Sequence, residues 1–111
     1  MKIDEQQQGA VTMLKPDGPL IEADVPAFKE RLMRTLASSK GRFVVDMSAV
    51  HFVDSAGLES LVDISDELGL SGQTLRLCAA NKTVREVLDL TDLTSRFDHF
   101  EDANTAVRSF L

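Results

Sequence analysis

Short apolar runs of strand length alternate along this chain with longer segments of helical periodicity, and this alternation limits the possible folds more than any other feature. Five segments suit strands, one polar and four apolar, at residues 3–8, 10–14, 42–47, 75–80 and 97–100. Strands that alternate with helices form a parallel or mixed sheet with helical cover. The sequence therefore predicts an α/β fold with a mixed sheet of four to five strands, flanked by about four helices.

The helices are indicated by apolar spacing and by capping residues. One apolar face of the first helix is expected at Ile21, Val25, Phe28, Leu32 and Leu36. Asp24 is the expected N-cap of this helix, Asn81 that of the third helix and Asp102 that of the last. The turn-forming residues 16–19 (PDGP) are expected to end the strand that precedes the first helix.

Length and charge narrow the functional classes. A chain of 111 residues suits one domain, which we expect to span residues 1–111. Its net charge of −6 argues against nucleic acid or a membrane surface as the main partner, because neutralising phosphates needs clustered Lys and Arg. Without a long apolar run or a signal-peptide core in residues 1–5, a cytoplasmic location is expected. Cys78 stands alone, which excludes an internal disulfide and suits a small core residue.

The segment that carries chemistry is Asp54-Ser55-Ala56-Gly57-Leu58, between a strand and the start of the second helix. A helix start offers unpaired backbone N–H groups, which tolerate an added phosphate. Small Ala56 and Gly57 leave the Ser55 hydroxyl uncovered. From these residues alone, Ser55 is most simply the N-cap of the helix, because serine and aspartate are common caps.

A family resemblance adds to this interpretation. Residues 53–58 (VDSAGL), after the strand at residues 44–48 (VVDMS), resemble the signature of the STAS domain family, named for sulfate transporters and anti-sigma-factor antagonists. Residues 84–93 (VREVLDLTDL) resemble a later helix and turn of that family, where Asp92 replaces the usual glycine. The element order is similar across nearly the whole chain.

The resemblance to the anti-sigma-factor antagonists implies a phosphorylation switch at Ser55. The partners it implies are a serine kinase that is also the anti-sigma factor, and a serine phosphatase that removes the phosphate. The unmodified protein would bind the kinase and release its client, and phosphorylation would end the binding. The resemblance implies no catalysis, no cofactor or metal, and a monomer or weak dimer. The implied partner-binding residues are Asp54, Ser55, Ala56, Gly57, Leu58, Glu22, Asp24 and Glu59.

Two alternatives stay open. The first is a constitutive STAS subunit of a transporter complex or a signalling scaffold, with Ser55 only a helix cap. It is favoured by residues 18–21 (GPLI), because the sigma-regulating members carry a Gly-Glu-hydrophobic-Asp turn there. The second is an enzyme, which lacks an assembled site: His51 and His99 have no metal-ligand spacing, and no nucleophile elbow surrounds Ser55. The acidic face of the second helix, which includes Glu59, is most simply a solvated surface.

Overall fold

The computed structural model describes all residues from Met1 to Leu111, and it confirms the predicted α/β fold. In chain order the elements are β1 (Lys2–Gln8), β2 (Val11–Asp17), the 3-10 turn η1 (Glu22–Asp24), α1 (Val25–Ser39), β3 (Phe43–Asp46), α2 (Ser55–Gly69), β4 (Leu75–Cys78), α3 (Lys82–Leu90), η2 (Thr94–Arg96), β5 (Phe97–Phe100) and α4 (Ala103–Arg108). The five strands form one mixed sheet in the order β1-β2-β3-β4-β5. β1 is antiparallel to β2, and the remaining neighbours are parallel. None of the helices is long and apolar enough to cross a membrane.

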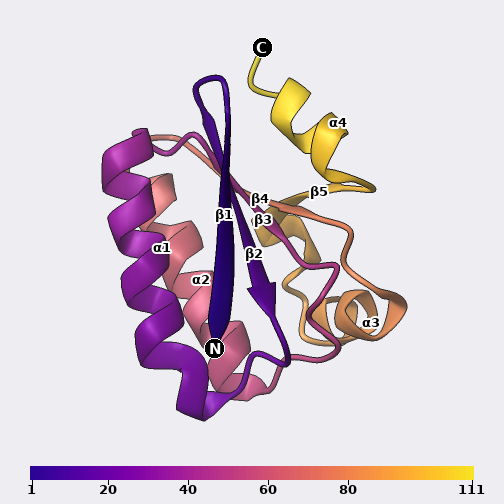
Figure 1. Cartoon of the computed structure of the whole chain (residues 1–111). Coiled ribbons are helices and arrows are strands. Elements are labelled where there is room, and N and C mark those ends of the chain that lie inside the picture. The colour runs from indigo at the N-terminus through magenta and orange to yellow at the C-terminus, as the bar shows by residue number, and fades with distance from the viewer.

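Alternation along the strands divides the core between the two faces of the sheet. Successive side chains of a strand point to opposite faces. Leu14 and Val45 accordingly lie in the main core cluster, which α1, α2 and α3 complete. Their neighbours Met13 and Val44 belong to a smaller cluster on the other face, under α4. Figure 1 shows α1 and α2 side by side on one side of the sheet, with α4 on the other. The burial of Cys78 in the smaller cluster confirms it as a core residue, and this burial raises the pKa of its thiol to about 12.

The predicted end of β2 was too early. The strand continues through Pro16 to Asp17, and Pro16 lies opposite Ile3 of β1. The ladder between β2 and β3 covers only Thr12 to Leu14. Pro16 lies beyond that ladder, so its missing N–H removes no hydrogen bond to β3. The turn therefore begins at Gly18, which has a φ of 108°.

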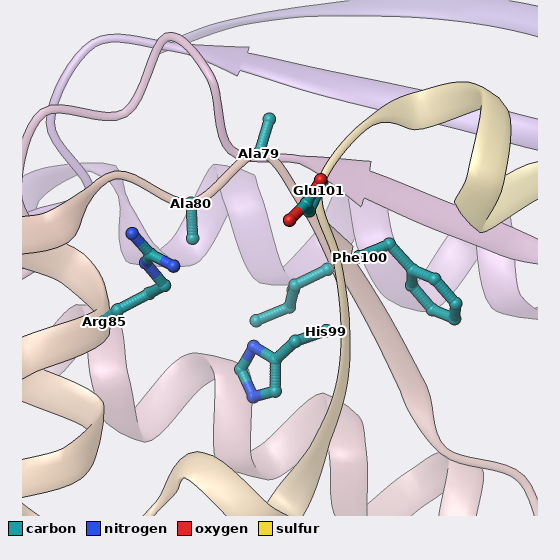
Figure 2. Close-up of a pocket in the computed structure, with 7 residues that line it drawn as sticks. Ala79, Ala80, Arg85, His99, Phe100 and Glu101 are labelled. Carbon is teal, nitrogen blue, oxygen red and sulfur yellow. The ribbon is translucent and has the colours of Figure 1, made fainter.

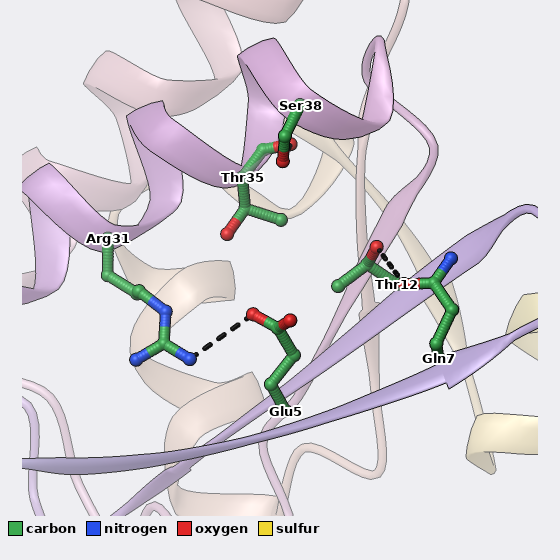
Figure 3. A network of polar contacts seen from close by, with 6 residues as sticks. All are labelled: Glu5, Gln7, Thr12, Arg31, Thr35 and Ser38. Carbon is green, nitrogen blue, oxygen red and sulfur yellow. Dashed lines mark hydrogen bonds and ion pairs between the residues drawn. The ribbon is translucent and has the colours of Figure 1, made fainter.

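The polar edge strand β1 is tied to the rest of the fold by side chains (Figure 3). The guanidinium of Arg31 on α1 lies 3.2 Å from a carboxylate oxygen of Glu5. The hydroxyl of Thr12 on β2 donates to the side-chain oxygen of Gln7, at 2.8 Å. The segment at residues 3–8 is thus the edge strand that its sequence indicated, although most of its side chains are exposed.

Asp92, which replaces the glycine usual in the STAS family, lies in the turn that ends α3. The amide of Leu93 donates to Leu88 O at 2.8 Å, and that of Asp92 to Asp89 O at 3.2 Å. These two bonds form the Schellman motif that ends α3, and its left-handed position falls on Asp92, with a φ of 58°.

We therefore predict that Asp92→Gly stabilises the protein by about 0.5–1 kcal/mol, because glycine adopts this conformation without the steric cost of a Cβ. Urea unfolding of both proteins measures the difference. The matched control is Asp98→Gly on β5, an exposed aspartate outside any left-handed turn, where glycine is expected to destabilise the strand. Equal or lower stability of Asp92→Gly would show that Asp92 is not strained.

Candidate functional site

The segment at residues 52–58 lies where the carboxyl ends of two parallel strands meet. β2 leads into α1 and β3 leads into α2, so the first turns of both helices lie at the same end of the molecule (Figure 1). Ser55 is the first residue of α2, and its side chain is exposed. The structure therefore places the predicted phosphorylation site on the surface, at a helix start.

The sequence indicated Ser55 as the N-cap of α2, and this prediction is wrong. Asp54 occupies that position, in extended conformation, and its Oδ1 accepts a hydrogen bond from the amide of Gly57 at 2.8 Å. Aspartate and serine cap equally well, so the contacts of the surrounding fold decide between them. The hydroxyl of Ser55 is consequently free of a capping role.

Asp54 also joins α2 to the segment before α1. Its Oδ2 accepts from the amide of Glu22 at 2.9 Å, so one carboxylate holds the start of α2 and the start of η1 together. The amide of Asp54 donates to Leu20 O at 3.1 Å, and the amide of Leu20 donates to Phe52 O at 3.1 Å. Leu20 and Val53 thereby form a short parallel bridge outside the main strands.

The other acidic residues that were predicted to bind the partner lie in different surroundings. Glu22 is exposed and lies beside Asp54. Glu59 is exposed one helical turn after Ser55, on the same side of α2. Asp24 precedes α1 at the predicted N-cap position, but its side chain caps no amide and lies 3.5 Å from the amino group of Met1. We define the switch surface as the exposed or partly exposed residues that these contacts bring together: Glu22, Phe52, Asp54, Ser55, Ala56 and Glu59.

Two predicted partner-binding residues are buried. Gly57 is inside the protein, and Leu58 is 8% exposed and packs in the main core cluster. A Cβ on Gly57 would lie 2.4 Å from Leu20 O, so glycine is needed for the close approach of the two segments. The direct partner contact predicted for these two residues is therefore corrected to a supporting role beneath the switch surface.

One residue of this surface was missed from the sequence. Phe52 is 48% exposed, whereas its neighbour Val53 is 6% exposed. In the sequence, Phe52 and Val53 are consecutive apolar residues, and this pattern predicts burial for both. The exposure of this aromatic ring, three residues before the serine, became visible only with the fold.

The acidic face of α2 is partly neutralised within the chain. The ammonium of Lys29 on α1 donates to Asp63 at 2.7 Å, and this hydrogen bond raises the pKa of Lys29. Asp66 pairs with Arg96 of η2. These contacts hold α2 to its neighbours, whereas Glu59, one turn after Ser55, is exposed and forms no ion pair.

A second candidate site lies away from Ser55. A cavity of about 340 Å³ opens beyond the end of β4, with Arg85 on one side and His99 and Glu101 nearby (Figure 2). Nε2 of His99 lies 2.7 Å from Thr94 O, and the ring of Phe100 is turned away from the cavity in Figure 2. The lining contains no nucleophile beside a base, and no three metal-ligating side chains gather anywhere in the chain. This cavity includes none of the predicted site residues.

Several known proteins resemble this chain in sequence or in fold. The family model described as STAS domain matches residues 2–106. An anti-sigma factor antagonist of Mycobacterium paratuberculosis superimposes with a TM-score of 0.83 at 23% identity, over 97% of this chain and 92% of that one. The cell fate determinant SpoIIAA of Bacillus in its phosphorylated form gives a TM-score of 0.72 at 14% identity, over 99% of this chain and 100% of that one. The murine anion transporter Slc26a9 gives 0.75 at 20% identity, over 95% of this chain but 18% of the transporter.

Proposed function

The chain belongs to the STAS domain family, and from this premise we propose that it is a protein-interaction module switched by phosphorylation of Ser55. The unmodified switch surface binds a serine kinase that is also an anti-sigma factor, and so releases the client of that kinase. Phosphorylation ends the binding, and a serine phosphatase restores it. The site of action is the cytoplasm, where ATP is available to the kinase.

The single observation that carries this proposal is the exposure of Ser55 on a surface where another residue caps the helix. Because Asp54 takes the capping role, phosphorylation of Ser55 removes no hydrogen bond that α2 needs. The added phosphate lies near the positive end of the helix dipole, which favours an anion. The folded protein can therefore exist in both forms. The likeness to the phosphorylated form of SpoIIAA supports the proposal, since that protein accommodates a phosphate in a similar fold.

STAS domains are generally non-catalytic, and in the proposed cycle this chain is a ligand and a substrate. The kinase supplies the catalytic groups and transfers the γ-phosphoryl group of ATP to the hydroxyl of Ser55, with loss of the hydroxyl proton and release of ADP. The exposed position of Ser55 leaves room for an active site of that kind.

The experiment that tests this function starts from the source organism. Each serine kinase of the anti-sigma type is purified and incubated with the protein and ATP, and intact mass with site mapping follows. One phosphate on Ser55, absent in Ser55→Ala and removable by a serine phosphatase, is the expected result. The matched control is Ser48→Ala, because Ser48 is another exposed serine, in the connection between β3 and α2. It is expected to accept phosphate as wild type does.

A second candidate function is a constitutive subunit of a transporter complex. It is favoured by the likeness to the anion transporter Slc26a9, of which a STAS-like region is only a part, and by residues 18–21 (GPLI), which lack the acidic turn. The same mass measurement, made on protein purified from its native cells, separates the two functions. Absence of phosphate under growth and stress conditions, with recovery of transporter components in a pull-down, would support the constitutive subunit.

A further inference from the structure

Phe52 is an exposed aromatic side chain within the switch surface. Of the four exposed large apolar side chains, Leu70 and Leu90 lie at the ends of helices and Leu111 is the last residue, whereas Phe52 lies three residues before Ser55. Val53, which forms the short bridge with Leu20, is buried between the two. Phe52 on one side of Val53 is exposed, and Asp54 on the other side is partly exposed.

The backbone around Phe52 is held in place before any partner arrives. The carbonyl of Phe52 accepts from Leu20 at 3.1 Å, and the amide of Asp54 donates to Leu20 at 3.1 Å. Two further bonds of the Asp54 carboxylate fix the segment that follows. An aromatic side chain on a fixed backbone loses little conformational entropy when it binds, which is a property of the strongest contacts in protein interfaces.

The charged side chains of the switch surface are all acidic. Glu22 and Glu59 are exposed, and Asp54 accepts only from backbone amides. Lys29 pairs with Asp63, and the amino group of Met1 pairs with Asp24. The other cations at this end, Lys82 and Arg85, lie on α3, outside the switch surface. An apolar ring with an acidic surround is complementary to an apolar pocket with a basic rim.

We propose that Phe52 is the anchor of the kinase interface, and that the kinase binds its ring in an apolar pocket rimmed by Lys or Arg side chains opposite Glu22 and Glu59. This inference rests on the proposed function and adds the chemistry of the partner to it. The basic rim meets the acidic residues beside Ser55, whereas Ser55 itself faces the nucleotide of the kinase. The rim thus contributes affinity and orientation, and the ring contributes the buried apolar contact.

The test uses the kinase that phosphorylates Ser55 in the experiment above, loaded with Mg-ADP, and measures its affinity for variants of the full chain across a range of NaCl concentrations. Phe52→Ala is expected to weaken binding about 30-fold at every salt concentration, which corresponds to the ~2 kcal/mol that defines an interface hot spot. Glu22→Gln and Glu59→Gln are expected to weaken binding less and to reduce its salt dependence. Leu90→Ala, at a residue that is 85% exposed at the end of α3, is the matched control and is expected to bind as wild type does.

Folding and function are separated by two further readouts. Phe52→Leu keeps an apolar side chain and is expected to retain most of the affinity, and thermal unfolding verifies that Phe52→Ala is folded. Binding of Phe52→Ala within about threefold of wild type, while the kinase still phosphorylates Ser55, would overturn the anchor and leave the proposed function intact. If the affinity of the kinase for the wild-type chain did not change with NaCl concentration, the proposal of a basic rim would be wrong. If no kinase phosphorylates wild type at Ser55, the proposed function fails and the inference fails with it.

Discussion

Phosphorylation of Ser55 is expected to weaken binding of the kinase by about 10⁴-fold, or roughly 5.5 kcal/mol, which is what complete switching between two states requires. The modification adds a charge of about −1.5 to −2. It places this charge beside Asp54 and near Glu22, on a surface that is already acidic. Because the kinase must bring the γ-phosphate of ATP to Ser55, the phosphoserine that forms lies against the phosphates of the bound nucleotide. Like charges brought together in a desolvated interface repel strongly.

The measurement is a titration of Mg-ADP-bound kinase with unmodified protein and with protein carrying one phosphate on Ser55. Treatment with a serine phosphatase is expected to restore the original affinity. Ser55→Ala is expected to bind as the unmodified protein does and to resist switching. Ser55→Asp is expected to bind with intermediate affinity, because one carboxylate carries less charge than a phosphate. A phosphorylated form that binds within about tenfold of the unmodified one would place Ser55 at the rim of the interface and contradict the switch.

The capping arrangement makes this experiment interpretable, because the fold is expected to survive every change at Ser55. Asp54 satisfies the amide of Gly57, so Ser55→Ala removes no cap. The loss of about 1 kcal/mol that a serine N-cap would predict for this variant is therefore not expected. A phosphate at the helix start contributes about 0.3–1 kcal/mol of favourable interaction with the dipole. Thermal unfolding of all forms checks that lost binding is not lost structure.

Periodicity was sufficient for most of the fold because the responsible interactions are local. The caps at Asn81 and Asp102 are examples, since each side chain accepts from an amide three residues later. The short apolar runs likewise identified strand residues, which the structure divides between the two faces of the sheet. Asp24, which caps no amide, and Pro16 were exceptions. Whether a proline ends a strand depends on how far the neighbouring strand extends, and β3 stops pairing with β2 at Leu14.

The switch surface was less predictable because contacts distant in sequence create it. Ser55 and Asp54 are adjacent possible caps, and the bond from the amide of Glu22, 32 residues away, accompanies the choice of Asp54. Leu20 lies against Gly57 and is hydrogen-bonded on either side of Val53, which turns Phe52 outward and Gly57 inward. No local pattern contains that contact. The motif thus indicated where the site lies, and its neighbours determine which residues of the motif face a partner.

Gly57→Ala is expected to destabilise the protein by about 3 kcal/mol, the upper part of the usual range for overpacking. The new Cβ would lie 2.4 Å from Leu20 O and 2.7 Å from Cγ1 of Val53. Real Cβ atoms do not approach a backbone oxygen so closely, so residues 20–22 or the start of α2 must move. That movement separates Asp54 from Glu22 and disturbs the switch surface. Urea unfolding measures the loss of stability, and phosphorylation by the kinase at a temperature where the variant is folded measures the disturbance.

The same helix contains a matched control position, at which alanine is expected to raise the stability of the protein. Gly69 is the last residue of α2 and has no positive φ, and a Cβ added there would meet nothing within 4 Å. Gly69→Ala is therefore expected to stabilise the protein by about 0.4–1 kcal/mol. Adding Val53→Ala to Gly57→Ala removes the contact with Cγ1 but leaves the one with Leu20 O. The double variant is therefore expected to remain at least as unstable as Gly57→Ala. Recovery of wild-type stability in it would show that side-chain crowding, and not the close backbone approach, requires glycine at this position.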